Sequence, residues 1–197
     1  MKQYFEENPA LLTDERMLPL DIFGHHLKFL SNNGLFSCDK VDGASIILLE
    51  NMPPITGHLL DLGCGYGVLG IALGKKQNIT LTMADINGIA LDYATRNAAL
   101  NHVAATPIQS NSFENIPGQF NNIVLNPPIH AGKDTMYRMY KEAAQHLIPG
   151  GALYIVIYKK HGAESTIKTF ETIFDTVEIL YKKKGCFVVA GRINATP

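Results

Sequence analysis

The feature that most constrains the fold is an alternation of short apolar segments with helical segments between residues 58 and 158. The apolar segments have the length and composition of buried strands, and the segments between them show helical periodicity. Strands joined through helices pair in parallel, and helices then cover both faces of the sheet. We therefore predict a doubly wound α/β fold. The predicted strands are HLLDLG, LTMADI, ATPIQSN, FNNIVLN and ALYIVIY.

The predicted helices fill the intervals. One covers residues 44–51, is capped by Asp42 or a neighbour and is closed by two prolines. The others are GVLGIALGKK, GIALDYATRNAALN, DTMYRMYKEAAQHLI and AESTIKTFETIF. The third of these is ended by Pro149-Gly150-Gly151. The final segment, TVEILYKKKGCFVVAGRI, reads as a hairpin that turns near Lys184-Gly185, and its connection is too short for a parallel crossover.

The first forty residues differ from the rest. LDIFGHHLKFLSNNGLFS reads as two short strands around Asn32-Asn33-Gly34, because Asn-Gly is a strong hairpin signal. We predict an N-terminal extension with a short β-hairpin over residues 1–40 and one domain over residues 41–197.

A glycine-rich loop, LLDLGCGYGVLG, joins the first predicted core strand to its helix. In such sheets ligands bind beyond the carboxyl ends of the strands, so the loop is a candidate binding site. Gly63, Gly65 and Gly67 permit backbone conformations and close approaches that a side chain would prevent. Gly65, Gly67 and Gly70 also satisfy the dinucleotide pattern GxGxxG, which is weak by itself.

Two acids refine the choice of ligand. Asp61, two residues before the first glycine, would oppose a pyrophosphate and suits a ligand with positive charge, such as the sulfonium and ammonium of S-adenosylmethionine. Asp85, which closes the next strand, can accept hydrogen bonds from both ribose hydroxyls of an adenosine. The alternatives are an acid favoured by the helix dipole for Asp61 and a helix cap for Asp85.

Several motifs together resemble class I S-adenosylmethionine-dependent methyltransferases. They are DLGCGYGVLGIA, MADINGIAL, NPPIHAG and LIPGGALYIVI, and GLFSCDKVDGAS adds a resemblance to the "methyltransferase small" group, which includes bacterial small-subunit ribosomal RNA guanine-N2 methyltransferases. The resemblance runs from about Gly34 to the end of the chain. It implies a mostly parallel, Rossmann-like sheet of seven strands whose last strand is antiparallel.

The resemblance also implies the site residues. The asparagine and prolines of NPPI would end the fourth strand beside the methyl donor, where the Asn126 side chain and the Pro127 carbonyl hold an amino group of the substrate. The predicted catalytic set is Asn126, Pro127, Pro128 and Ile129. The predicted cofactor set is Asp61, Gly63, Cys64, Gly65, Gly67, Asp85, Ile86, Asn111 and Asn126.

Two positions depart from the family pattern. Many relatives carry an aromatic residue after the prolines, whose ring can stack on a base, whereas this chain has Ile129. Stacking would then come from Phe36, Phe113 or a tyrosine, or the substrate is not a base. Relatives often place an acid where this chain has Asn111, whose amide can still accept from the adenine amino group. His130 and Lys133 flank the predicted site, and their roles stay open.

Composition excludes other classes of protein. The chain is 46% hydrophobic and 18% charged, which is typical of a globular domain. The three cysteines are scattered and the histidines form no HExxH motif, so we expect neither a disulfide framework nor a metal site. The acidic N-terminal segment lacks the apolar core of a signal peptide and no apolar run is long enough for a membrane span, so we expect the cytoplasm.

The sequence therefore predicts an N-methyltransferase that acts on a guanine amino group of ribosomal RNA. The alternatives are a protein glutamine amide or a small molecule as the methyl acceptor, and an NAD-dependent oxidoreductase. The net charge of −1 does not itself indicate a nucleic-acid partner. RNA contacts would then come from the N-terminal hairpin, from the basic C-terminal edge or from a second subunit in a homodimer.

Overall fold

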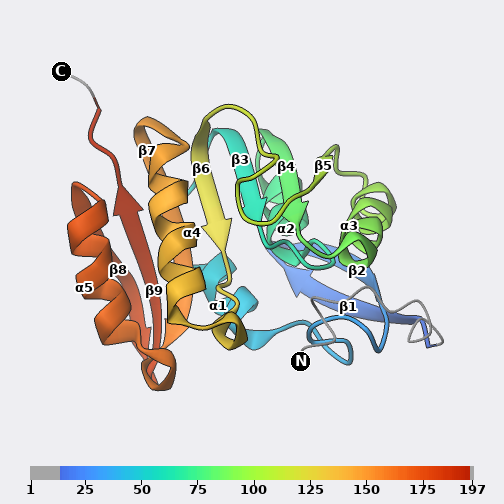
Figure 1. Cartoon of the computed structure of the whole chain (residues 1–197). Coiled ribbons are helices and arrows are strands. Elements are labelled where there is room, and N and C mark those ends of the chain that lie inside the picture. The colour runs from blue at the N-terminus through green and yellow to red at the C-terminus, as the bar shows by residue number, and fades with distance from the viewer. Residues whose placement is uncertain (1–13, 196–197) are drawn as a thin grey trace.

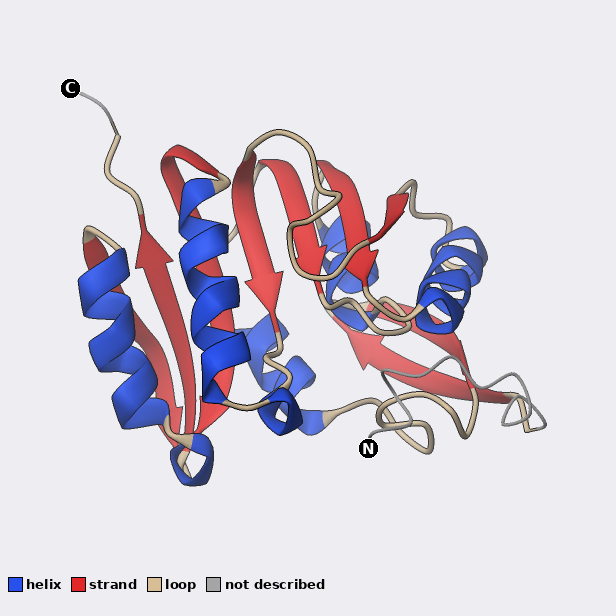
Figure 2. Cartoon of the chain, in the orientation of Figure 1, coloured by secondary structure: helices blue, strands red, loops and turns tan. Residues whose placement is uncertain are grey.

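The computed structural model describes residues 14–195 and contains one seven-stranded sheet, in the order β5-β4-β3-β6-β7-β9-β8. The pairs formed by β3 to β7 are parallel, and β9 runs antiparallel to both of its neighbours. This confirms the predicted doubly wound sheet with an antiparallel last strand (Figures 1 and 2). The strands are β3 (Gly57–Leu62), β4 (Ile79–Asp85), β5 (Thr106–Gln109), β6 (Phe120–Leu125), β7 (Leu147–Tyr158), β8 (Thr176–Lys183) and β9 (Cys186–Arg192).

Helices cover both faces of the sheet, because side chains of each strand alternate between two apolar clusters. On β7, Tyr154 belongs to the cluster beneath the first three helices, and its neighbour Ile155 belongs to the cluster beneath the last two. Figure 1 shows α4 and α5 on one side of the sheet and α1 and α2 on the other. The helices are α1 (Gly43–Asn51), α2 (Val68–Lys76), α3 (Gly88–Leu100), α4 (Lys133–Gln145) and α5 (Ala163–Ile173).

The predicted N-terminal hairpin is present, but its turn was misplaced. Strands β1 (Arg16–Ile22) and β2 (His25–Ser31) turn at Phe23 and Gly24, which have φ values of 56° and 78°. A type I′ hairpin turn needs positive φ at both central positions, and Phe-Gly is a weaker sequence signal for it than the Asn-Gly at 33–34. Instead, Asn32 follows β2, where its side chain accepts a hydrogen bond from the Gly34 amide at 2.8 Å.

The hairpin is fastened to α3 by two asparagines one turn apart. The Asn97 side chain bonds the Leu30 amide at 2.7 Å and its carbonyl at 3.0 Å, and Asn101 bonds the Lys28 amide at 3.1 Å and its carbonyl at 2.8 Å. The two side chains thus satisfy backbone groups that the outer edge of β2 would otherwise expose. This attachment places the segment after β2 beside the carboxyl ends of the sheet strands.

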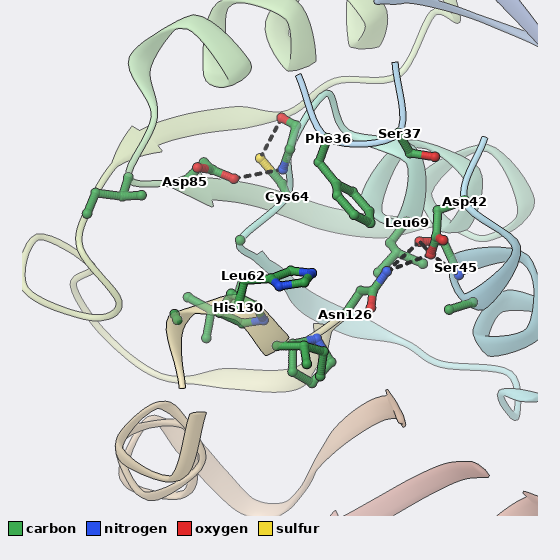
Figure 3. Close-up of a pocket in the computed structure, with 18 of the residues that line it drawn as sticks. Phe36, Ser37, Asp42, Ser45, Leu62, Cys64, Leu69, Asp85, Asn126 and His130 are labelled. Atoms are coloured by element: carbon green, nitrogen blue, oxygen red, sulfur yellow. Dashed lines mark hydrogen bonds between the residues drawn. The ribbon is translucent and has the colours of Figure 1, made fainter. Parts of the chain in front are cut away.

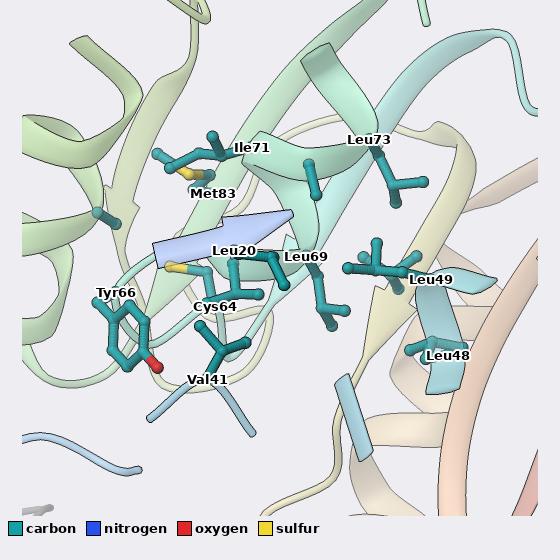
Figure 4. Close-up of a cluster of buried hydrophobic side chains, with 14 of the residues drawn as sticks. Leu20, Val41, Leu48, Leu49, Cys64, Tyr66, Leu69, Ile71, Leu73 and Met83 are labelled. Carbon is teal, nitrogen blue, oxygen red and sulfur yellow. The ribbon is translucent and has the colours of Figure 1, made fainter. Parts of the chain in front are cut away.

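The apolar face of the hairpin shares one core with α1, α2 and the central strands. Leu20, Val41, Leu49 and Leu69 all belong to this cluster (Figure 4). The division of the chain at residue 40 stays a prediction, although the two parts it separates pack together. Within residues 14–195, none of the helices combines the length and apolar character that a bilayer crossing requires.

The helix predicted over 134–148 ends earlier, at Gln145, and β7 begins at Leu147 rather than at Ala152. The reason is sheet pairing, because the Phe120 amide of β6 donates to the His146 carbonyl at 2.8 Å and Leu147 pairs with Phe120. A tertiary contact therefore replaces the last turn that local periodicity favoured.

Candidate active site

A cavity of about 550 Å³ opens at the carboxyl ends of β3, β4, β6 and β7. Its walls come from the segment after β2, the first turn of α1, the glycine loop, the ends of β4 and β7, and the segment after β6. Figure 3 shows side chains from these segments converging on it. Of the residues predicted for the site, the cavity wall includes Gly63, Cys64, Gly65, Asp85, Ile86, Asn111, Asn126, Pro127, Pro128 and Ile129.

The glycine loop needs its glycines for two different reasons. Gly65 lines the cavity with a φ of 55°, so it exposes bare backbone in a left-handed conformation. Gly67, with a φ of 94°, is the N-cap of α2, and a Cβ there would come within 2.7 Å of the Ile71 side chain. Gly67 does not line the cavity, so the structure gives it a packing role, and its predicted contact with a ligand stays a prediction.

Asp85 braces the glycine loop from the end of β4. One carboxylate oxygen accepts from the Gly65 amide at 2.8 Å, and the other accepts from the Asn87 amide at 2.9 Å. Only 3% of the residue is exposed, and that part lies at the cavity wall. Because Asp85 reaches the cavity wall, the predicted ribose contact is compatible with its position and stays a prediction.

Asp61 lies behind the loop rather than at the cavity wall. It is fully buried, and one carboxylate oxygen accepts from the Gly70 amide at 2.8 Å. Burial raises the pKa of Asp61 to about 7, the Gly70 hydrogen bond opposes this rise, and the charge of Asp85 adds to it. The structure thus places Asp61 outside the cavity wall, and its predicted contact with a cationic ligand stays a prediction.

Asn111 lines the cavity, but its amide already has protein partners. Its nitrogen donates to the Glu114 carboxylate at 2.7 Å, and its oxygen accepts from Arg138 at 3.3 Å. Arg138 also lines the cavity and was not anticipated from the sequence, because only the fold brings α4 beside this loop. The predicted contact of Asn111 with an adenine amino group remains a prediction.

The NPPI segment makes a rigid turn at the end of β6. Pro128 has φ −75° and ψ 80°, and the Ile129 amide donates to the Pro127 carbonyl at 2.9 Å. This is an inverse γ-turn, which holds the Pro127 carbonyl in one direction and occupies one of its two lone pairs. The short helix η3 (Ile129–Ala131) follows and places Ile129 and His130 at the cavity.

Asn126 is the polar end of this turn, and two residues hold its amide. Its nitrogen donates to the Asp42 carboxylate at 2.8 Å and to the Ser45 hydroxyl at 3.1 Å (Figure 3). The sequence identified Asp42 as a helix cap, which is confirmed by its bond to the Ser45 amide at 3.0 Å. Nothing in the sequence indicated that the same side chain would reach Asn126.

One aromatic ring and two histidines complete the mouth of the cavity. Phe36 is 52% exposed, and its ring projects toward the space between Asn126 and His130 in Figure 3. His161, on the short helix η4 (Lys159–His161), also lines the cavity. Burial lowers the pKa of His161, and the charges of Lys160 and His130 lower it further, so the imidazole is mainly neutral at pH 7.

Metal-ligating side chains do not gather in the part of the chain that the structure describes. No three His, Cys, Asp or Glu side chains between residues 14 and 195 are close enough to hold one ion. The polar groups at the cavity include the backbone of the glycine loop, the carboxamides of Asn111 and Asn126, the carboxylates of Asp42 and Asp85, and several hydroxyl groups. Such a set suits an organic ligand with hydroxyl and amino groups.

Comparison with known proteins gives one family match and several relatives. Residues 26–190 match the family described as methyltransferase small domain. The chain is 34% identical to YbxB of Bacillus subtilis, a protein of uncharacterized function, with 97% of this chain and 98% of that protein aligned. It is 42% identical to ribosomal RNA small subunit methyltransferase C of Pasteurella multocida over 66% of this chain and 42% of that protein.

A solved structure resembles almost the whole chain. It is a T. thermophilus 16S rRNA N2 methyltransferase in complex with AdoMet and guanosine, with a TM-score of 0.84 and 26% identity over 96% of this chain. That alignment covers 53% of the T. thermophilus protein. The chain thus spans about half of the length of this structure and less than half of the Pasteurella relative.

Proposed function

The chain belongs to the methyltransferase small domain family, and from this premise we propose that it methylates the exocyclic amino group of a guanine in ribosomal RNA. Family membership makes it an S-adenosylmethionine-dependent methyltransferase, which replaces the NAD-dependent alternative. The observation that carries the finer proposal is the position of Asn126 and Pro127. They lie in the same cavity as the glycine loop and Asp85, with acceptor oxygens on a rigid turn.

The residues at the cavity fit the cofactor. Gly63 and Gly65 expose backbone at one end, Asp85 offers acceptors for hydroxyl groups, and Ile86 contributes an apolar surface that is 39% exposed. When bound, S-adenosylmethionine supplies a methyl group made electrophilic by its sulfonium. Of the predicted cofactor residues, those at the cavity wall are the ones proposed here: Gly63, Cys64, Gly65, Asp85, Ile86, Asn111 and Asn126.

The chemical problem lies with the acceptor. The amino nitrogen of guanine is a poor nucleophile because its lone pair is delocalised into the ring. Asn126 Oδ1 and the Pro127 carbonyl can each accept one of its two hydrogens, which orients the nitrogen and stabilises the positive charge that develops on it. Once the N–C bond has formed, the nitrogen carries one proton too many, and that proton passes to water at the exposed mouth of the cavity.

A basic rim supports a polyanionic substrate. Exposed lysines gather where η4 meets the turn between β8 and β9, and the Lys159 amide donates to the Gly185 carbonyl at 2.7 Å. The rim is Lys159, Lys160, Lys182, Lys183 and Lys184. Glu164 is the acid that pairs with it, at 3.3 Å from Lys159. Since Tyr158 and His161 line the cavity, phosphates next to a bound nucleotide can reach the rim.

One observation favours a second candidate, a protein glutamine amide or a small molecule as the acceptor. Ile129 presents no ring at the position where a base would stack. Phe36 can supply that ring from the opposite wall, and its exposed position in the cavity keeps the guanine proposal ahead. A ribosomal substrate also places the protein in the cytoplasm, and a homodimer is a further proposed source of RNA contacts.

The test is methyl transfer from radiolabelled S-adenosylmethionine into ribosomal subunits, naked ribosomal RNA and ribosomal protein. The substrates should come from cells that lack the gene, so that the target is unmethylated. We expect label in RNA, and digestion to nucleosides should place it in N2-methylguanosine. Label found only in protein would contradict the proposal and support the glutamine alternative. Gel filtration of the same preparation tests the homodimer.

A further inference from the structure

The Asp42 carboxylate makes an unusual set of contacts for a helix cap. One oxygen accepts from the Ser45 amide at 3.0 Å, the Ser45 hydroxyl at 3.2 Å and the Asn126 side chain at 2.8 Å. Two of these bonds stay within the first turn of α1. The third crosses to the end of β6, 84 residues away along the chain.

We propose that Asp42, assisted by Ser45, is a positioning residue that fixes which end of the Asn126 amide faces the substrate. This inference rests on the proposed role of Asn126. An ionised carboxylate can only accept hydrogen bonds, so the group of Asn126 that faces Asp42 must be its NH2. Figure 3 shows that nitrogen directed at Asp42 and Ser45, with the amide oxygen on the other side. On the proposed role of Asn126, that oxygen is the group left to accept from the substrate.

The orientation matters because an amide that rotates by half a turn keeps its shape and reverses its chemistry. A rotated Asn126 would present NH2 to the amino group of the substrate, and two donors would then face each other. The Asp42 contact opposes this rotation, because rotation would place the amide oxygen against a carboxylate.

The negative charge has a second effect on the same amide. A hydrogen bond from the Asn126 nitrogen to an anion polarises the amide and increases the electron density on its oxygen. That oxygen then becomes a stronger acceptor for an amino group on which positive charge is developing. Both effects act on turnover, whereas cofactor affinity depends on the glycine loop and Asp85.

The experiment separates this role from helix capping. Ser and Asn both cap helices about as well as Asp, so Asp42→Ser and Asp42→Asn should fold. Asp42→Ser has no acceptor long enough to reach Asn126, whereas Asp42→Asn keeps a neutral one. We expect kcat to fall about tenfold or more in Asp42→Ser and only a few-fold in Asp42→Asn, with the KM for RNA and S-adenosylmethionine affinity within about threefold.

A double-mutant cycle provides the decisive comparison. If Asp42 acts through Asn126, then Asp42→Ser should lower kcat by less than about twofold when Asn126 is already alanine. An equal decrease in both backgrounds would overturn the proposal, as would a folded Asp42→Ser enzyme with wild-type kcat. Asp92→Ser, on the exposed surface of α3, is the matched control and should leave kcat unchanged.

A second readout needs no activity. In ¹⁵N-labelled protein the side-chain NH2 signal of Asn126, assigned by its loss in Asn126→Ala, should exchange slowly with solvent. The exchange should accelerate in Asp42→Ser, and also, to a smaller extent, in Ser45→Ala. Rapid exchange in the wild type would refute the fixed orientation. If the wild-type enzyme methylates protein instead of RNA, the proposed substrate is wrong. The exchange measurement, and the double-mutant cycle repeated with that protein as substrate, would still test the role of Asp42.

Discussion

The two halves of the cavity are built by different kinds of contact. On the cofactor side, Asp61 and Asp85 each bond backbone amides that lie 2 to 20 residues away. On the substrate side, Asn126 is held by Asp42 and Ser45, which lie 84 and 81 residues away. The cofactor side can therefore be recognised in two motifs that are close in sequence, whereas the substrate side exists only after β6 and α1 have come together.

Removing Asn126 should have the largest effect and should separate the two halves. We expect Asn126→Ala to lower turnover by roughly 10² or more, because one of the two acceptors of the substrate amino group is lost. Affinity for S-adenosylmethionine should stay within several-fold. Single-turnover kinetics and calorimetry measure the two quantities, and near-normal turnover would remove Asn126 from the mechanism.

The second prediction concerns Asp61, the buried acid of the cofactor side, and the effect of its ionisation on the stability of the fold. Its pKa of about 7 lies above that of an acid in the unfolded chain, so the native state binds more protons between these values. The Asp61 contribution to stability is therefore greatest below about pH 4 and is lost as pH rises through about 7.

Asp61→Asn keeps an acceptor for the Gly70 amide and cannot ionise. At each pH the quantity of interest is the free energy of unfolding of the variant minus that of the wild type. We expect this difference to increase by roughly 2–3 kcal/mol from pH 4.5 to pH 7.5. Urea unfolding at both pH values measures the difference, and any packing cost that does not depend on pH cancels. The exposed control Asp92→Asn should show little change, and an equal response in both variants would contradict the Asp61 assignment.

Asp85→Ala should have the opposite pattern to Asn126→Ala: it should reduce cofactor affinity and leave turnover nearly unchanged. The Gly65 and Asn87 amides lose their acceptor, so we expect S-adenosylmethionine affinity to fall about tenfold or more. Turnover at saturating cofactor should change much less. Calorimetry with Asp92→Ala as control checks this, and an unaltered affinity would show that the loop keeps its shape without Asp85.

The lysine rim extends the comparison to the outer surface. Changing Lys182, Lys183 and Lys184 to alanine should weaken RNA binding several-fold to about tenfold and reduce the slope of log K against log salt by up to about 2. The exposed helix lysines Lys141 and Lys168 are the control pair. Equal salt slopes in both variants would show that phosphates do not contact the rim.

Ile129 should produce the smallest effect. A ring introduced by Ile129→Phe can stack on a base, which we expect to lower the KM for RNA a few-fold. Cofactor affinity should not change, because Ile129 lies on the substrate side. An increase in KM without loss of stability would indicate that Phe36 and a second ring cannot both fit against the substrate.

Much of the fold was predictable because its signals are local. Apolar segments of strand length, helices between them and a short final connection led to the parallel sheet with its antiparallel last strand. One error occurred where distant pairing prevailed over local preference, because Leu147 joined β7 by pairing with Phe120. The other was local: the register of β1 and β2 places the hairpin turn at Phe23 and Gly24, although Asn33-Gly34 is the stronger turn sequence.

The same division applies to the site. Glycines at alternate positions and the Asn-Pro-Pro turn can be recognised from the sequence, because their backbone requirements depend on residue type alone. Which polar atom faces the cavity depends on burial and on partners from other elements. Tertiary structure alone placed Asp61 behind the loop and brought Asp42 to the Asn126 amide, because hydrogen bonds between distant segments form only when packing brings them within about 3 Å.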